Sequence, residues 1–200
     1  NNYLKQNNYS GEHFNDLLDL YPLFLRPKIL TILRYLKTKK KENKCYKVMI
    51  YTNNQGNKNW ANNIKKYFEY KIDEPLFDKI IGAFKVGGKH IELCFIDDVY
   101  HAGMTDDKVY YINVKPYKHQ LSINDMINTF LHSNLGLVVK NNEQFEHAMK
   151  ADFKRYSYRV NQKTKEEQEI DEIIGKRMLQ HLKQFFYEKT NRTYKKKTKD

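Results

Sequence analysis

Two stretches of this sequence, YKVMIYTNN at 46–54 and IELCFIDD at 91–98, decide the fold class. Each is a short apolar run that stops abruptly at polar residues, the first at Thr52 and the second at Asp97 and Asp98. Short apolar runs of this kind, rich in β-branched residues and bounded by polar turns, are typical of strands buried in a parallel sheet. Both stretches are therefore predicted to be buried strands.

The segments around these two strands follow helical periodicity. Apolar residues recur at helical spacing in 28–37, in 58–70 and in the stretch after Ser122, which is predicted to be the N-cap of a helix that ends before Gly136. Another short strand is expected at 109–117. This alternation of strands and helices predicts an α/β fold, a Rossmann-like three-layer domain with a mainly parallel sheet.

From Asn141 onward the chain becomes long, charged and helical. We expect a C-terminal helical extension there, and therefore two parts, 1–140 as the α/β domain and 141–200 as the extension with a basic tail. An apolar stripe across 165–187 indicates that this extension packs on the core or on a partner; it consists of Ile170, Ile173, Ile174, Met178, Leu182, Phe185 and Phe186.

The charge of the chain is uneven. The 200 residues include 36 Lys and Arg against 24 Asp and Glu, a formal net charge of +12, and the stretches 37–47 and 189–200 each carry a net +5. The first is expected to be a helix-to-strand loop and the second a solvated tail. The charge of the tail allows non-specific contact with polyanions. One hypothesis for the function is therefore a nucleic-acid-binding accessory protein.

Several features concern the cellular compartment. No apolar run approaches the roughly 18 residues that span a bilayer, and NNYLKQNNYS at the start lacks the features of a signal peptide. The two cysteines, Cys45 and Cys94, are too few for a metal site and are expected to be free thiols, with a disulfide left open. We therefore expect an intracellular protein, cytoplasmic or nuclear, with no membrane partner.

The two strand ends suggest a site. Ligands of open α/β sheets bind beyond the carboxyl ends of the strands. There, the Thr52 hydroxyl and the turn amides from Asn53 onward can hold a phosphate oxygen, and Asp97 and Asp98 form a hard-oxygen pair suited to Mg²⁺. Lys85 or Lys89 can supply a counter-charge.

Each of these residues also has a structural interpretation. Thr52 can simply end a strand and cap the next helix, whereas two adjacent carboxylates repel each other unless a cation or donors compensate, which favours a function for Asp97 and Asp98. Lys85 and Lys89 are, taken singly, ordinary surface lysines. His101, like His90, has no partner at ligand spacing and is expected to be a loop histidine.

Taken together, the motifs resemble the haloacid dehalogenase superfamily. Within it they are similar to the aspartate-based phosphatases of the RNA polymerase carboxy-terminal domain and to their relatives, the nuclear LIM interactor-interacting factors. The resemblance covers about residues 20–137, where the matching segments occur in the expected order; they are Arg26-Pro27, YKVMIYTNN, Trp60-Ala61, FIDDVYH and INVKPY at 112–117.

The resemblance implies a magnesium-dependent phosphatase acting on a phosphorylated substrate. Thr52 and Asn53 would bind phosphate, Lys85 or Lys89 would serve as the catalytic lysine, and Asp97 and Asp98 would bind the metal. The superfamily's first motif, a strand ending in Asp-x-Asp with the nucleophile, is absent from this sequence. Either that motif lies upstream of residue 1, or the domain is a catalytically inactive structural or interaction protein.

Overall fold

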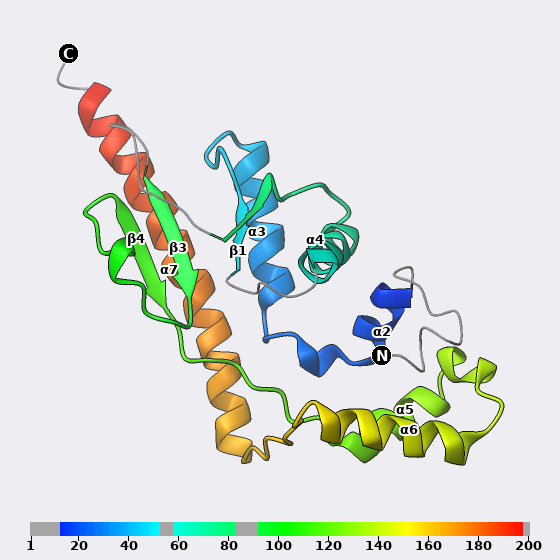
Figure 1. The fold of residues 1–200 in the computed structure, drawn as a ribbon. Coiled ribbons are helices and arrows are strands. Elements are labelled where there is room, and N and C mark those ends of the chain that lie inside the picture. Colours follow the sequence, from blue (N-terminus) through cyan, green and yellow to red (C-terminus); the bar gives the residue numbers. More distant parts are fainter. Residues whose placement is uncertain (1–12, 53–57, 83–91, 198–200) are drawn as a thin grey trace. The chain divides into compact units, whose positions relative to one another are not determined.

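The structure is a computed structural model that describes residues 13–52, 58–82 and 92–197, with only the backbone at 58, 59 and 189–197. These residues form a mixed α/β fold, which confirms the predicted class at this level (Figure 1). The chain divides into two compact units: unit 1 comprises residues 1–26 and 118–166, and unit 2 comprises 27–117 and 167–200. This grouping differs from the expected parts 1–140 and 141–200, because the helix after Ser122 packs with the next helix along the chain.

Unit 1 is helical. Its elements are α2 (Phe14–Leu20), the 3-10 helix η2 (Pro22–Phe24), α5 (Ile123–Leu131), η4 (Asn134–Val138) and α6 (Asn142–Arg155). Their apolar faces meet in one core of Tyr21, Met126, Ile127, Phe130 and Phe145. The hydroxyl of Tyr21 donates a hydrogen bond to the Met126 carbonyl at 2.6 Å, and burial raises the pKa of Tyr21 to about 12. The hydroxyl therefore stays protonated and ties the first segment of unit 1 to the second.

The predicted start of α5 is confirmed, and its predicted end needs a correction. The Ser122 hydroxyl accepts a hydrogen bond from the Asp125 amide at 3.0 Å, as an N-cap does. The helix ends at Leu131, with His132 as its C-cap, and Gly136 lies further on, inside η4. Gly136 therefore does not cap the helix; it permits η4 to fold back against the last carbonyls of α5.

The described residues of unit 2 form four short strands in two parallel pairs. β1 (Met49–Tyr51) pairs with β2 (Lys79–Ile81), and β3 (Leu93–Asp97) pairs with β4 (Val109–Asn113). The predicted strands are therefore present, although those at 46–51 and 109–117 are shorter than expected. Among the described residues β1 pairs with no other strand than β2, and β3 with no other than β4, so the hydrogen bonds join two separate sheets.

Helix α3 (Ile29–Lys41) lies at the centre of unit 2 and buries two of its faces. Its Ile32 packs with Met178, Leu182 and Phe186 of α7 (Lys165–Lys197). The neighbouring Leu33 packs with Val48, with Ile72 of α4 (Lys58–Ile72) and with Leu76. Cys94 and Ile96 of β3 also contact the α7 cluster, so α7 covers one face of the β3–β4 pair (Figure 1).

Only part of the predicted stripe on α7 is buried. Met178, Leu182 and Phe186 are buried, whereas the side chains of Ile170 and Ile173 are 41% and 47% exposed. Within the buried part, a Cβ at Gly175 would lie 2.4 Å from the Pro27 carbonyl oxygen. A glycine is therefore needed where α7 crosses the chain just before α3.

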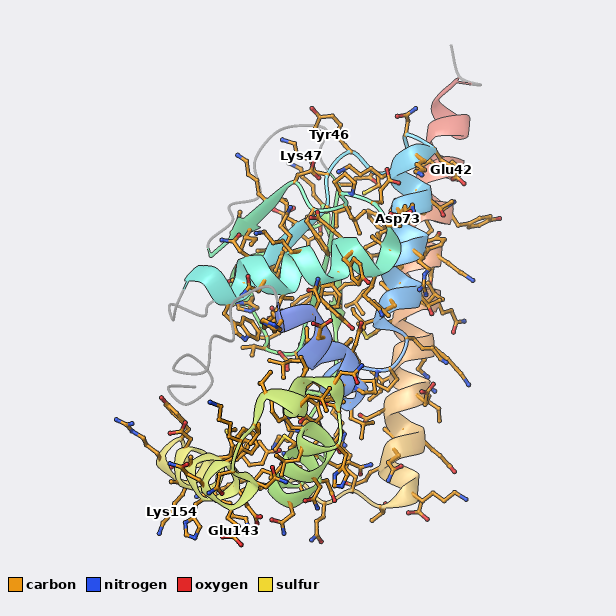
Figure 2. All side chains as sticks on the ribbon, turned by 90° about the vertical axis from the view of Figure 1, so that its right-hand side faces the viewer. Glu42, Tyr46, Lys47, Asp73, Glu143 and Lys154 are labelled. Carbon is orange, nitrogen blue, oxygen red and sulfur yellow. The ribbon has the colours of Figure 1, made fainter. Side chains whose placement is uncertain are left out.

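The lysine cluster of 37–47 lies only partly in the predicted helix-to-strand loop, which begins after Lys41. Lys37 to Lys41 belong to the last turns of α3, and ion pairs hold most of this cluster. Lys37 and Lys41 pair with Glu74, Lys40 pairs with Asp78, and Lys39 and Lys44 pair with Glu42. Beyond the helix, Tyr46 and Lys47 project from the connection to β1 (Figure 2). The pairs with Glu74 and Asp78 therefore hold α3 against the connection between α4 and β2.

Three further features of the sequence can be compared with the structure. Cys45 and Cys94 are free thiols. On helix α4, Trp60 is 51% exposed, whereas Tyr67 is buried. Among the described residues, no helix is long and apolar enough to cross a membrane.

Candidate functional site

The carboxyl ends of β1 and β3 lie together, although no hydrogen bonds join these strands. The ring of Tyr51, the last residue of β1, lies edge-on to Phe95 of β3 with centroids 5.4 Å apart, and to His101 with centroids 5.3 Å apart. All four strands run parallel to their partners, and in Figure 1 the labelled strands β1 and β3 point the same way. Thr52 and Asp97 therefore end neighbouring strands on the same edge.

The carboxylate of Asp97 at this edge contacts the loop that follows β3. One carboxylate oxygen, Oδ1, accepts a hydrogen bond from the Val99 amide at 2.8 Å, and Oδ2 lies 3.5 Å from Nε2 of His101. Its side chain is 17% exposed. Asp98 is exposed in the bend that follows β3. The two adjacent carboxylates are thus in different environments, because donors compensate the charge of Asp97 and water compensates that of Asp98.

Tyr111 of β4 fixes the loop that follows these carboxylates. Its hydroxyl donates a hydrogen bond to the Val99 carbonyl at 2.6 Å and accepts one from the His101 amide at 3.1 Å. The ring of Tyr100 stacks on that of Tyr111, with centroids 6.2 Å apart and 21° between the ring planes. One side chain thereby holds both ends of the turn and keeps His101 next to Asp97.

His101 is the residue of this edge that sequence reasoning missed. Its ring lies edge-on to Tyr51 and Phe95, so it joins the two sheets, and among the described residues its buried Nε2 has no hydrogen-bond partner. The only signal in the sequence for this contact is the spacing Asp97-x-x-x-His101. In an extended strand, side chains at that spacing lie too far apart to touch. The turn at 98–101 folds the histidine back onto Asp97, which only the structure shows.

The other predicted site residues are placed only in part. Thr52 follows β1 directly and is partly buried, and its amide donates a hydrogen bond to the Ile81 carbonyl at 2.9 Å, which extends the β1–β2 pairing by one residue. Asn53, Lys85 and Lys89 lie outside the described residues. The structure thus brings Thr52 and Asp97 to one edge and does not describe the lysines or Asn53.

The carboxylates fit Mg²⁺ in kind and number. Magnesium is usually held by one or two carboxylates, together with water and substrate phosphate oxygens, and Asp97 and Asp98 provide that pair. In the part of the chain that the structure describes, no cluster of three or more His, Cys, Asp or Glu side chains is placed to hold a metal.

A hollow of about 620 Å³ lies away from this edge, at the carboxyl end of α4. It is open to solvent and is lined by Glu69, Tyr70, Lys71, Asp73, Glu74 and Pro75. Of the predicted site residues that the structure describes, none lines it.

Comparisons of the chain with protein-family models, curated proteins and solved structures find no match.

Proposed function

We propose that this chain is part of a magnesium-dependent phosphatase-type domain like those of the haloacid dehalogenase superfamily, acting on a phosphorylated substrate. The observation that carries the proposal is the contact of Tyr51 with Phe95 and His101, since it brings the end of β1, with Thr52, to the end of β3, with Asp97. This is the edge where open α/β sheets bind their ligands.

The separation of β1 and β3 into two sheets supports a further strand between them, which this proposal requires. Strands in one sheet lie about 4.8 Å apart and exchange hydrogen bonds, which β1 and β3 do not do. Each has a single partner among the described residues, which leaves one edge of each strand available for a further strand. We propose that a strand from upstream of residue 1 pairs with both, completes a Rossmann-like three-layer domain and carries the nucleophilic aspartate at its end.

The residues of this chain then have distinct roles. The Thr52 hydroxyl and the Asn53 amide bind oxygens of the phosphoryl group, and Lys85 or Lys89 balances their charge. Asp97 and Asp98 hold Mg²⁺, which when bound neutralises charge that develops on the phosphoryl oxygens. The upstream carboxylate forms a bond to phosphorus while the bond to the ester oxygen breaks, and water then hydrolyses the acyl phosphate.

The second candidate is a catalytically inactive domain of the same fold that acts as a structural or interaction protein with a protein partner. It is favoured by the contacts of Asp97, whose two oxygens already face the Val99 amide and the His101 ring. These contacts hold the carboxylate in place without a metal.

The test is hydrolysis of p-nitrophenyl phosphate by the natural full-length protein, with and without Mg²⁺. We expect magnesium-dependent turnover that falls about 100-fold or more in Asp97→Asn and Asp98→Asn, by analogy with the loss of one electrostatic group in other active sites. The matched control is Asp107→Asn, which changes an exposed carboxylate in the β3–β4 connection and leaves turnover unchanged. A folded protein with no turnover and no bound magnesium would establish the inactive domain instead.

A further inference from the structure

The segment 154–165 of unit 1, KRYSYRVNQKTK, is strongly basic. It carries five cations and no carboxylate, namely Lys154, Arg155, Arg159, Lys163 and Lys165. We call it the basic segment. It begins in the last turn of α6 and ends at the first residue of α7.

The cations of the basic segment differ from those of α3 in their surroundings. Lys154, Arg155, Arg159 and Lys165 are exposed and form no ion pair with a described residue, and the charge of Arg155 helps to lower the pKa of Asp152, which lies just before the segment. Figure 2 shows Lys154 at the outer surface of the α6 ribbon. In the stretch 37–47, by contrast, five lysines form ion pairs with Glu42, Glu74 and Asp78, which offset part of their charge. Two stretches with the same formal charge therefore offer different potentials to a partner.

The backbone of the basic segment is held in place by its neighbours. Ser157 turns the chain with a φ of 52°, and Tyr158 then packs inward, where its hydroxyl donates a hydrogen bond to the Leu121 carbonyl at 2.6 Å. Further along, the Asn161 side-chain amide donates to the His119 carbonyl at 3.3 Å. The cations are thus displayed on a fixed scaffold, which reduces the entropy lost when they bind.

Between these cations an aromatic ring faces solvent. Tyr156 is 69% exposed, whereas Tyr158, two residues on, is packed against His119. Cations that track a phosphate backbone, together with an exposed ring on which a base can stack, are the combination that binds single-stranded nucleic acid. We propose that the basic segment of unit 1 is a binding surface for single-stranded nucleic acid, independent of the phosphatase-type site.

Two other partners fit the basic segment less well. A membrane surface requires an apolar face, and Val160 is the one exposed aliphatic side chain in the segment. An acidic peptide would use the cations but not the exposed ring.

The carboxylates that follow the basic segment belong to the next helix. Glu166, Glu167 and Glu169 lie in the first turns of α7, where they stabilise the positive end of the helix dipole.

The test is fluorescence anisotropy of labelled oligouridylate with the full chain at several salt concentrations. The triple variant Lys154→Gln, Arg155→Gln, Arg159→Gln should bind about tenfold more weakly. Its slope of log affinity against log salt should be shallower by about 2, since each lost phosphate contact removes about 0.7 for a single strand. Tyr156→Ala should weaken binding roughly 5- to 150-fold without changing the slope, because it removes stacking and no charge.

Two controls keep the proposal falsifiable. The variant Lys39→Gln, Lys41→Gln, Lys44→Gln removes the same charge from the paired cluster of α3 and should bind like the parent chain. The variant Lys195→Gln, Lys196→Gln, Lys197→Gln tests the basic tail. Equal losses in all three triple variants, loss confined to the tail variant, or equal binding of polyglutamate would each overturn the proposal. Circular dichroism of every variant establishes that it is folded.

Discussion

Gly136 illustrates how a single missing side chain shapes unit 1. A Cβ at this position would lie 2.5 Å from the Phe130 carbonyl oxygen and 2.6 Å from that of Leu131. Both atoms belong to the backbone of the last turn of α5, so they cannot move aside without distorting the helix. The absence of a side chain at Gly136 is therefore what allows η4 to pack against the end of α5.

We predict that Gly136→Ala destabilises the chain by about 1–3 kcal/mol, the usual cost of forcing extra atoms into a packed site. Urea unfolding followed by circular dichroism measures the effect. The control is Gly103→Ala in the 3-10 helix η3 (Ala102–Met104), where nothing lies within 4 Å of the added Cβ and stability should stay within about 0.5 kcal/mol. Equal losses in both variants would show that the contact with α5 is not the cause.

At the scale of elements, α7 is one helix with two different surroundings. Toward its carboxyl end Leu182 is 2% exposed, in the cluster with Ile32, Met178 and Phe186. Toward its amino end Ile170 and Ile173 are exposed. The periodicity of the sequence is the same in both parts, so the helix carries an apolar stripe that unit 2 covers at Met178, Leu182 and Phe186 and leaves exposed at Ile170 and Ile173.

We predict that Leu182→Ala destabilises the chain by about 2–5 kcal/mol, because it removes a fully buried side chain and leaves a cavity against α3. On the same helix, Ile170→Ala should cost less than about 1 kcal/mol, since its side chain is largely hydrated already. Urea unfolding of the two variants side by side checks this. A larger loss for Ile170→Ala would mean that the exposed half of α7 is covered in the folded protein.

At the scale of the whole molecule, the two units are each built from two separate pieces of chain. Within unit 1, His119 helps to join them: its ring lies edge-on to Phe24 at 4.6 Å and stacks on Tyr158 at 5.9 Å between centroids. Burial lowers the pKa of His119, and the charge of Lys163 lowers it further. The folded unit therefore favours the neutral imidazole.

This pKa shift predicts that unit 1 becomes less stable in mild acid. In the unfolded chain His119 takes up a proton below about pH 6.5, whereas in the folded chain its lower pKa delays that uptake. The free energy of unfolding therefore decreases as the pH falls from about 6.5 through the folded pKa. Hydrogen-exchange protection of α5 and α6, corrected for intrinsic rates, should fall over this range and change less in His119→Asn. The exposed His147→Gln serves as the control and should keep the fall. Protection that is independent of pH would contradict the prediction.

The sequence alone predicts much of the secondary structure. Helices close to 29–41, 58–72 and 123–131, the Ser122 cap and the strands β1, β3 and β4 follow from periodicity and turn chemistry, which act over a few residues. It also identified the polar ends of β1 and β3, because an apolar run that stops at Thr52 or at Asp97 is visible in one dimension.

How these elements group, and what surrounds each polar residue, depends on the tertiary structure. The tertiary structure places α5 with α6 in unit 1, pairs lysines of α3 with carboxylates, leaves Ile170 and Trp60 exposed and folds His101 back onto Asp97. Each of these outcomes depends on residues far apart in the chain, or on a turn whose direction is set by a distant side chain such as Tyr111. Local propensity carries no information about such partners, and packing does.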